Sequence, residues 1–563
     1  MKKKILLIGI NARWTHSNPA LYYLRTYVND LNYDIQICEY TINQTLIDLI
    51  SDIYKKNPDI IAFSVYIWNT KTVQNILKDI KKILPECRII LGGPEVSYHP
   101  EQWFEKFKID HIICGNGESG FRELLLQDFD SKMKIIKKAN PPFSEIPFPY
   151  IDSDKELLKN KYLYYEASRG CIFKCSYCLS SREDQKFSYR KLEQIKSELD
   201  FLLDFKPKII KFVDRTFNAN PELARSIWIF LSKKTDLTKF HFEIHPSLLK
   251  ENDFEILEKI PLGKFQFEIG IQSFNNDTLK EIRRNVDVKK VTTNIKKLIE
   301  LKNIHIHLDL IAGLPFEDIF TFQNSFDSVY DLKPDQLQLG LLKVLDGTFM
   351  KENSEKYSLK YQSESPYMIL SNKWLSFGDI VKLHEIEKLL EIYYNSGKFE
   401  TTLIEIQKLF TSPFEFFNKL RKFVISQQID TNSMIWIKSA KLLQDFIKKY
   451  HNEKLVFFRD CLRWDWCKMA KSHYYPDFLN EHIFKKIKKD NSVRLKELFK
   501  QKYPELDSSL VKHAIYFTPI SSKFAKEFLQ NKTLIVFINF PQKDIEHRKS
   551  LFIELDEIHF NLK

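Results

Sequence analysis

The sequence lacks the features that mark secreted, membrane-spanning or strongly charged proteins. Its eight cysteines in 563 residues are too few for a disulfide framework. No run of 18 apolar residues occurs, so we expect no membrane span. The amino-terminal stretch Lys2–Ile8 is not a signal peptide, because the apolar run stops at Asn11 and no small-residue cleavage site follows. It is predicted to begin a first strand instead.

Charge is not concentrated in any one block either. The chain carries 86 Lys and Arg against 74 Asp and Glu, a formal excess of 12 positive charges. These charges are spread along many predicted helices, which favours solvated helix faces over a surface for nucleic acid. We therefore expect no nucleic acid among the partners. With 44% hydrophobic residues the chain can bury a large core, and its length predicts roughly three or four domains.

What the sequence does contain is a compact cysteine motif, Cys171, Cys175 and Cys178, at C-x3-C-x2-C spacing. A closed structural zinc site needs four protein ligands, and no nearby fourth Cys or His follows. A [4Fe–4S] cluster is normally held by four cysteines, so three leave one iron open to a substrate or cofactor. A loose zinc knuckle is the alternative. A cluster loop needs reduced thiols, which predicts a cytoplasmic protein.

This motif, with the aromatic Tyr177 before its last cysteine, resembles the cluster loop of the radical S-adenosylmethionine (SAM) superfamily. The resemblance implies that Cys171, Cys175 and Cys178 are the metal ligands and the catalytic centre, with Tyr177 beside the cofactor. It also implies that SAM chelates the open iron and is cleaved to methionine and a 5′-deoxyadenosyl radical. Such a reaction needs a substrate, which the sequence does not identify, and an electron donor such as flavodoxin or ferredoxin.

Upstream of the motif, residues 1–138 alternate short apolar runs with amphipathic stretches. This alternation predicts an α/β domain with a parallel sheet and helices on both faces. Ligands bind such sheets at the carboxyl ends of the strands. The expected strands are Lys4–Ile10, Asp34–Cys38, Ile60–Val65, Arg88–Leu91 and His111–Cys114.

Two glycine-rich loops, Gly92-Gly93 and Gly115–Gly120, follow the fourth and fifth of these strands. With Ser64 upstream, they resemble the Rossmann-like cobalamin-binding domain of cobalamin-dependent radical SAM proteins. The resemblance implies that Ser64, Gly92 and Gly93 line the cobalamin pocket. However, His16 lacks the Asp and Gly partners of the motif whose His ligates cobalt in many cobalamin proteins. Either cobalamin binds without a His below the cobalt, or the domain has lost the cofactor.

A proline-rich linker is expected over residues 139–157, and the barrel over residues 158–352. Six strand-plus-helix units in this stretch match the partial (β/α) barrel of the radical SAM superfamily. The expected strands are Tyr162–Ala167, Ile209–Val213, Phe240–Ile244, Phe265–Ile269, His305–Ile311 and Gln336–Leu342.

Polar residues gather where these strands end, as barrel chemistry requires. By resemblance, Asp214 holds the SAM amino group, and Glu268 and Gln272 face its ribose and carboxylate. Ile311 and Gly313 would shape the adenine pocket by the same resemblance.

Residues 366–563 are predicted to form a mostly α-helical domain. It resembles the uncharacterised carboxy-terminal domain of one family of cobalamin-type radical SAM proteins. Asp379 is expected to cap a helix, and Ser412 with Glu415 forms a capping box. Trp464 is expected on a packed helix face. A small terminal sheet is predicted from Val511–Phe517, Leu534–Phe537 and Leu551–Leu555.

The leading hypothesis is a radical SAM enzyme that transfers a methyl group if cobalamin is present. One alternative is a nucleic-acid-modifying methylthiotransferase, which carries a second cluster on three cysteines of the amino-terminal domain. Here Cys38, Cys87 and Cys114 are far apart in the sequence, and buried reduced thiols are the default. The other alternative is a non-catalytic protein with a vestigial cluster, against which the intact cysteine set argues.

Overall fold

The fold is that of a computed structural model. It describes residues 2–554 apart from 130–131, 182–186, 285, 433, 471–473, 481–482, 503, 505–506, 531, 533 and 541–548. The chain divides into two compact units: residues 1–334 with 338–380, and residues 335–337 with 381–563. Within the described ranges, no helix combines the length and the apolar character needed to cross a bilayer.

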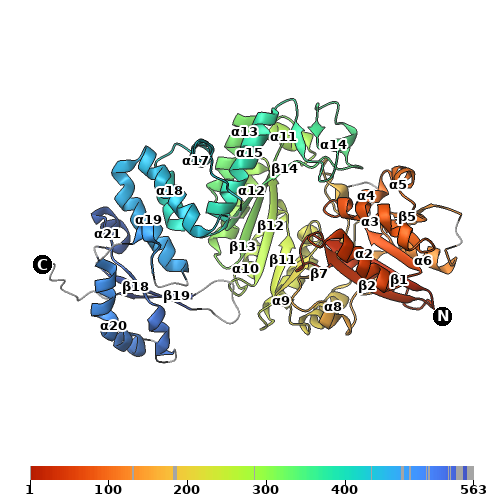
Figure 1. The fold of residues 1–563 in the computed structure, drawn as a ribbon, viewed down its shortest axis with the longest axis horizontal. Coiled ribbons are helices and arrows are strands. Elements are labelled where there is room, and N and C mark those ends of the chain that lie inside the picture. The colour runs from red at the N-terminus through yellow and green to blue at the C-terminus, as the bar shows by residue number, and fades with distance from the viewer. Residues whose placement is uncertain are drawn as a thin grey trace. The chain divides into compact units, whose positions relative to one another are not determined.

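The first unit begins with a six-stranded sheet in the order β2-β1-β3-β4-β5-β6, in which every pair is parallel (Figure 1). All five predicted strands are present, so the α/β prediction is confirmed. The sixth, β6, was not predicted, because three residues are too few to show a periodicity. The strands are β1 (Lys4–Asn11), β2 (Asp34–Thr41), β3 (Ile60–Ser64), β4 (Arg88–Gly92), β5 (His111–Cys114) and β6 (Ile135–Lys137).

The central strands of this sheet are buried on both faces, since β3 is buried throughout and β1 from its second residue on. Strands that are buried on both faces need apolar side chains on both, which explains the apolar runs Ile5–Ile8 and Ile60–Phe63. The helices that cover the sheet include α1 (Pro19–Tyr27), α2 (Leu46–Lys55), α3 (Thr70–Ile83), α4 (Pro94–Ser97), α5 (Pro100–Lys106) and α6 (Glu118–Leu126).

Cys38, Cys87 and Cys114 lie in the hydrophobic core of this domain and are free thiols. Burial raises the pKa of all three thiols, which keeps them protonated and inert. The prediction that they are buried reduced thiols is confirmed.

A buried carboxylate, Glu39 on β2, joins this domain to the segment that precedes the barrel. Its side chain is 6% exposed, and Lys161 Nζ lies 3.0 Å from Oε2. Oε2 also accepts from the Tyr22 hydroxyl at 3.0 Å, and Oε1 accepts from Asn11 Nδ2 at 3.0 Å and from the Asn18 amide at 2.6 Å. Glu39 therefore holds together several segments that are distant in the sequence.

The second sheet of the first unit has six strands in the order β14-β13-β12-β11-β10-β7 (Figure 1). These are the six strands predicted for the partial barrel, and β7 and β10 to β13 pair in parallel. They are β7 (Leu163–Tyr165), β10 (Ile209–Phe212), β11 (Lys239–Glu243), β12 (Phe265–Gln272), β13 (His305–Ala312) and β14 (Gln336–Leu341).

The two faces of this second sheet differ, because its strands alternate in burial; β12 is buried at every other residue. One face is aromatic and packs on helix α9 (Pro221–Ser232), where Trp228 lies 5.7 Å from the ring of Phe267. The other face is polar. Across it, Lys211 pairs with His241, and Glu268 lies between Glu243 and His307.

Helix α15 (Phe377–Leu390) begins close to the junction of the two units, and one prediction about it is wrong. Asp379 lies inside the helix instead of capping it. The cap is Ser376, whose hydroxyl accepts from the Asp379 amide at 3.2 Å, while the Asp379 carboxylate accepts from the Ser376 amide at 3.2 Å.

The second unit is mostly helical, as predicted. Ser412 caps α17 (Pro413–Ser426) by accepting from the Glu415 amide at 3.2 Å. Trp464 on α19 (Leu455–Met469) packs against Phe517 and Phe537, with ring centroids 5.0 and 4.9 Å apart. The other described helices of this unit are α16 (Glu400–Gln407), α18 (Trp436–Tyr450), α20 (Ile483–Lys502) and α21 (Ser522–Leu529).

The predicted terminal sheet of the second unit is also present. Its three antiparallel strands are β17 (Ile515–Phe517), β18 (Ile535–Phe540) and β19 (Lys549–Glu554). Residues 508–513 form a 3-10 helix, so the first strand is shorter than predicted.

Candidate functional site

The cysteine loop follows β7 and is anchored to the barrel from several sides. The Ser176 amide donates to the Ile282 carbonyl at 3.0 Å, and the Ser176 carbonyl accepts from the Met350 amide at 2.8 Å. Phe173 stacks on His245 with ring centroids 4.3 Å apart. The loop is therefore held in place at the carboxyl ends of the barrel strands, where such folds carry out their chemistry.

The three thiols of this loop lie within electrostatic reach of one another. Burial raises the pKa of Cys178, and the charges of Cys175 and Cys171 raise it further, whereas Arg215 opposes them. The hydroxyl of Thr216, just after β10, lies 3.5 Å from Cys171 Sγ. Thiolates this close together repel one another. A metal cluster bound by several of them would relieve that repulsion, as a nearby cation does in part.

No group of three or more His, Cys, Asp or Glu side chains in the described part of the chain is arranged to hold a single metal ion. A closed structural zinc site needs four protein ligands that converge on one point. A cubane spreads its cysteine sulfurs over different iron atoms, so three thiols on one loop suit it without converging. The donor set of the loop therefore fits an iron–sulfur cluster.

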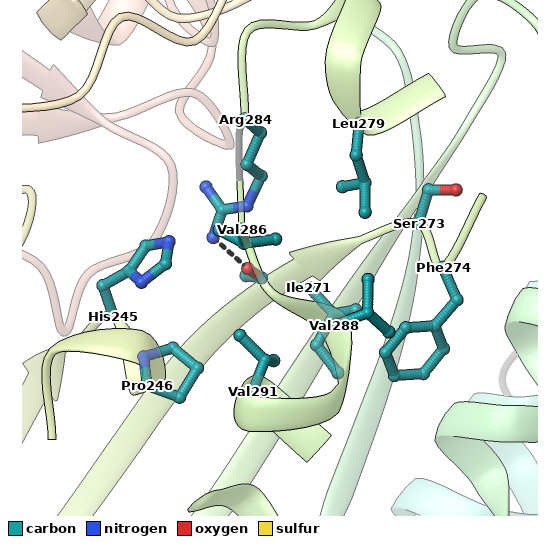
Figure 2. A pocket seen from close by; sticks show the side chains of 11 residues that line it. His245, Pro246, Ile271, Ser273, Phe274, Leu279, Arg284, Val286, Val288 and Val291 are labelled. Atoms are coloured by element: carbon teal, nitrogen blue, oxygen red, sulfur yellow. Dashed lines mark hydrogen bonds between the residues drawn. The ribbon is translucent and has the colours of Figure 1, made fainter. Parts of the chain in front are cut away.

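Arg284 is one of the residues that line a small pocket (Figure 2), and it also contacts the cysteine loop. Its Nη1 lies 3.7 Å from Cys175 Sγ, and its Nη2 donates to the Gly270 carbonyl. His245 and Arg284 lie at one end of the pocket, and Leu279 and Phe274 at the other. The pocket thus offers a cation beside the thiols and an apolar wall away from them.

Two of the polar residues predicted to face SAM, Gln272 and Glu268, lie on β12 but are not among the residues that line this pocket. Gln272 ends β12 with a left-handed φ of +72° next to a β-bulge, and its Oε1 is buried without a hydrogen-bond partner. Its side chain crosses Gly270, where an added Cβ would meet Nε2 at 2.1 Å. Glu268 accepts from His241 Nε2 at 2.9 Å on the polar face of the sheet. Gln272 and Arg284 both lie beside Gly270, whereas Glu268 lies four residues before Gln272 on β12.

The other predicted SAM residues have different surroundings. Asp214 is 1% exposed, and its carboxylate accepts from the Ala167 amide at 3.0 Å and the Ser168 hydroxyl at 2.5 Å. Burial raises its pKa to about 7. Asp214 therefore fixes the chain just before the cysteine loop, and its contact with the SAM amino group stays a prediction.

Ile311 and Gly313 are not among the residues that line the pocket beside Arg284. Gly313 has φ +98°, and a Cβ there would meet Ile369 Cγ2 at 2.8 Å. Its carbonyl accepts from Asn372 Nδ2 at 2.9 Å. Their role in an adenine pocket stays a prediction.

The three residues predicted to line a cobalamin pocket are adjacent in the first sheet. Ser64 is the register partner of Gly92, and Gly93 follows with φ +109°, where a Cβ would meet the Val65 carbonyl at 2.5 Å. Only glycine lets these two loops pass so closely. Because Gly92 and Gly93 have no side chains, the backbone at this carboxyl edge is uncovered, and a large ligand can approach it closely.

The same edge presents a flat aromatic surface that the sequence analysis missed. Trp68 stacks on Tyr66 with centroids 4.5 Å apart and an interplanar angle of 6°, and it stays 45% exposed. Its Nε1 donates to the Ile10 carbonyl at 3.1 Å. His16 is engaged elsewhere, because its Nδ1 hydrogen-bonds the hydroxyl of Tyr164 on β7. An exposed, anchored ring of this kind suits a planar ligand such as a corrin.

Arg169, directly before Gly170 and Cys171, joins this edge to the cysteine loop. Its Nη1 lies 2.6 Å from Oε1 of Glu118 in the Gly115–Gly120 turn, and its Nε lies 3.0 Å from Glu166 Oε1. Burial of the guanidinium lowers the pKa of Arg169, but the negative charges of Glu166 and Glu118 raise it by more, so the pKa is raised overall. Arg169, Glu118 and Arg284 were missed because single charged residues carry no spacing signal.

Three family models match the chain. The B12 binding domain matches residues 5–125, the Radical SAM superfamily residues 165–329, and a family described as a protein of unknown function, DUF4080, residues 355–537. The first two cover the two sheets described above, and the third covers most of the helical unit.

Several curated proteins are similar to part of this chain. The cobalamin-dependent radical SAM methyltransferase TokK from Streptomyces tokunonensis is 23% identical over 355 residues, which is 55% of this chain and 51% of that protein. The chain spans about half the length of the curated relatives that it matches first.

Two solved structures share the fold. The radical SAM methyltransferase TsrM from Kitasatospora setae, with cobalamin and a [4Fe-4S] cluster bound, covers 67% of this chain and 84% of its own at 15% identity and a TM-score of 0.54. The cobalamin-dependent SAM radical enzyme OxsB covers 82% of this chain and 79% of its own at 16% identity and a TM-score of 0.57. The chain therefore combines a B12 binding domain, a Radical SAM domain and a DUF4080 domain, in that order, as the three family models match them.

Proposed function

We propose that this protein is a cobalamin-dependent radical SAM enzyme that methylates a substrate. The observation that carries the proposal is the loop of Cys171, Cys175 and Cys178, held at the carboxyl ends of the barrel strands beside the cation of Arg284. Three thiols hold a [4Fe–4S] cluster with one iron free. When bound, the cluster supplies the electron for reductive SAM cleavage, and cobalamin supplies the methyl group.

Arg284 would bind the carboxylate of SAM. Its guanidinium lies next to Cys175, so a carboxylate chelating the free iron would meet a charged hydrogen-bond donor. Gln272 Oε1, buried and without a partner, requires a donor that an ammonium or hydroxyl group of SAM can supply. The apolar end of the pocket, with Leu279 and Phe274, excludes water from the reacting bond.

Ser64, Gly92 and Gly93 would contact the corrin at the carboxyl edge of the first sheet, with Trp68 as a flat apolar neighbour. A loop of this edge also contacts the segment that follows the barrel: Glu95, after Gly93, accepts from the Tyr367 hydroxyl at 2.9 Å. Both cofactors would therefore be bound at neighbouring edges of one compact unit. The reaction also needs a one-electron reductant, for which we propose a flavodoxin or a ferredoxin.

The test compares two cysteine variants after anaerobic reconstitution. Wild type should contain about four iron atoms per chain and release 5′-deoxyadenosine from SAM with a strong reductant. Cys175→Ala should lose the cluster and all SAM cleavage. Cys114→Ala, which removes a buried thiol from the first core, should keep both. SAM cleavage by Cys175→Ala would contradict the proposal.

The cobalamin part has its own readout. Full-length protein purified with added hydroxocobalamin should retain corrin absorption bands after gel filtration. Loss of these bands, with SAM cleavage intact, would restrict the proposal to a radical SAM enzyme without cobalamin.

A further inference from the structure

Arg169 contacts both regions to which the cofactors are assigned. In the sequence it lies two residues before Cys171. In space it pairs with Glu118, the first residue of α6, at 2.6 Å. Glu118 belongs to the Gly115–Gly120 turn at the carboxyl edge of the first sheet. One side chain therefore links the turn expected to contact the corrin with the loop expected to hold the cluster.

The contacts around Arg169 fix its position. Its guanidinium lies 4.8 Å from the ring centroid of Tyr23 and 4.5 Å from that of Phe143. Only 17% of its side chain and 6% of that of Glu118 are exposed. The second oxygen of Glu118 accepts from Asn140 Nδ2 at 2.5 Å. The pair cannot swing into water without breaking several contacts at once.

A buried ion pair of this kind makes the two loops depend on each other. Moving either loop away would leave an uncompensated charge in a buried place, which is far more costly than an exposed one. The guanidinium also contacts Glu118 and Glu166 through different nitrogens. It therefore fixes the relative orientation of the two carboxylates in addition to attracting them. Ordering the Gly115–Gly120 turn therefore favours one position of Arg169 and of the loop that follows it.

We propose that Arg169 is a positioning residue that couples the two cofactor sites, so that occupancy of either site strengthens binding at the other. The inference rests on the proposed function, because it assumes that both cofactors bind. By thermodynamic linkage the effect is reciprocal: the factor by which the cluster tightens corrin binding equals the factor by which corrin tightens cluster binding.

The experiment measures the affinity of the full-length protein for hydroxocobalamin by optical titration, before and after removal of the cluster with a chelator. Wild type should bind hydroxocobalamin about tenfold more tightly with the cluster than without it, within the usual range of coupling between sites. In Arg169→Gln and in Glu118→Gln this ratio should fall to about one. Arg169→Lys keeps the charge but cannot span both carboxylates, so it should give an intermediate ratio.

A second readout does not depend on a loaded cluster. Adding hydroxocobalamin to cluster-free wild type should slow amide hydrogen exchange in residues 171–178, and Arg169→Lys should weaken this protection. The matched control is Arg25→Gln. Arg25 pairs with Asp154 at 2.6 Å, with 16% and 0% of the two side chains exposed, and touches neither cofactor loop. It should lower stability and leave the affinity ratio unchanged.

The possible results separate the two proposals. A wild-type ratio of one, or a full ratio in Arg169→Gln, would overturn the coupling while leaving the proposed function standing. Failure of wild type to bind either hydroxocobalamin or a cluster would contradict the proposed function itself. If Arg169→Gln does not fold, Glu118→Gln and Arg169→Lys supply the same comparison, and unchanged ratios in both would overturn the inference.

Discussion

The two sheets of the first unit solve the problem of ligand binding differently. In the first sheet, β3 is buried at every residue, whereas in the second, β12 is buried only at every other residue. The central strands of the first sheet have no free face, so a ligand can approach them only at the loops that follow them. The second sheet keeps a polar face, on which Lys211 is the register partner of His241 and Glu268 is the register partner of His307. A binding site can therefore extend along the barrel strands, but not along the strands of the B12-binding domain.

The largest effect should come from placing a polar side chain in the first sheet. Ile61 on β3 is 0% exposed, so Ile61→Asn removes apolar packing and buries an amide without a partner. We expect a loss of about 4–5 kcal/mol in the free energy of unfolding. Gln266→Leu on the polar face of the barrel should change it by less than about 1 kcal/mol. Urea unfolding followed by circular dichroism measures both, and equal losses would refute the comparison.

The next largest effect concerns the narrow edge of the first sheet. Gly93→Ala forces a Cβ to within 2.5 Å of the Val65 carbonyl at a left-handed φ of +109°. It should cost about 2–3 kcal/mol of stability and lower hydroxocobalamin retention. Gly263 also has a left-handed φ, +72°, but nothing lies within 4 Å of an added Cβ. Gly263→Ala should therefore cost only about 1 kcal/mol and keep corrin binding, as gel filtration with added hydroxocobalamin can show.

A smaller effect should appear as a pH dependence of stability near the barrel. Glu317 is 0% exposed and hydrogen-bonded by the hydroxyls of Ser273 and Ser325 at 2.5 and 2.9 Å. Burial raises its pKa from 4.5 to about 7. The folded chain then keeps a proton that the unfolded chain releases, so the stabilisation is complete below about pH 4.5 and is lost as pH rises through 7.

We expect the free energy of unfolding of wild type to fall by about 2 kcal/mol between pH 5 and pH 8 through this group. Glu317→Gln, which cannot ionise, should remove that part of the dependence. Glu193→Gln, at a side chain that is 82% exposed, should leave the pH profile unchanged. Denaturant titrations at both pH values measure the difference, and identical profiles for wild type and Glu317→Gln would contradict the assignment.

The smallest change in stability is expected on the polar face. In wild type, Glu268 Oε2 lies 2.9 Å from His241 Nε2. Glu268→Gln keeps the shape of the side chain, so it should lower the free energy of unfolding by less than about 1 kcal/mol. Because Glu268 is predicted to face SAM, the rate of 5′-deoxyadenosine formation should nevertheless fall about tenfold, the effect of losing one hydrogen bond to a charged group. An unchanged rate would remove Glu268 from the SAM site.

The sequence predicted the parts of the fold that depend on periodicity. The five longer strands of the first sheet and all six barrel strands were expected within a few residues, because apolar runs bounded by Gly, Pro and polar turns mark them. Strand β6, with three residues, and the cap at Ser376 were missed. The strand depends on its tertiary contacts, and the cap depends on which of two neighbouring polar residues accepts a backbone hydrogen bond. A pattern of polarity in the sequence shows neither.

The candidate site was predictable where spacing carries chemistry and not elsewhere. The spacing of Cys171, Cys175 and Cys178 predicts a metal centre without further information. Ser64 and Gly92, which were predicted to line one pocket, are register partners in the structure. Arg284 and Arg169 reach the site from positions that only the packing of α11 (Asn276–Glu281) and of the domain junction determines. Asp214 was predicted to hold the SAM amino group, which stays a prediction; in the structure its carboxylate accepts hydrogen bonds from Ala167 and Ser168.

Glu39 has a practical consequence for domain exchange. Its carboxylate serves Asn11, Asn18 and Tyr22 within the first domain and Lys161 just ahead of the barrel. A chimera that took its first 138 residues from a relative would need an acidic residue at the position of Glu39. Without it, the buried ammonium group of Lys161 would lose its carboxylate partner. Domains of this protein can therefore be exchanged with those of a relative only when the residues at positions 39 and 161 come from the same parent.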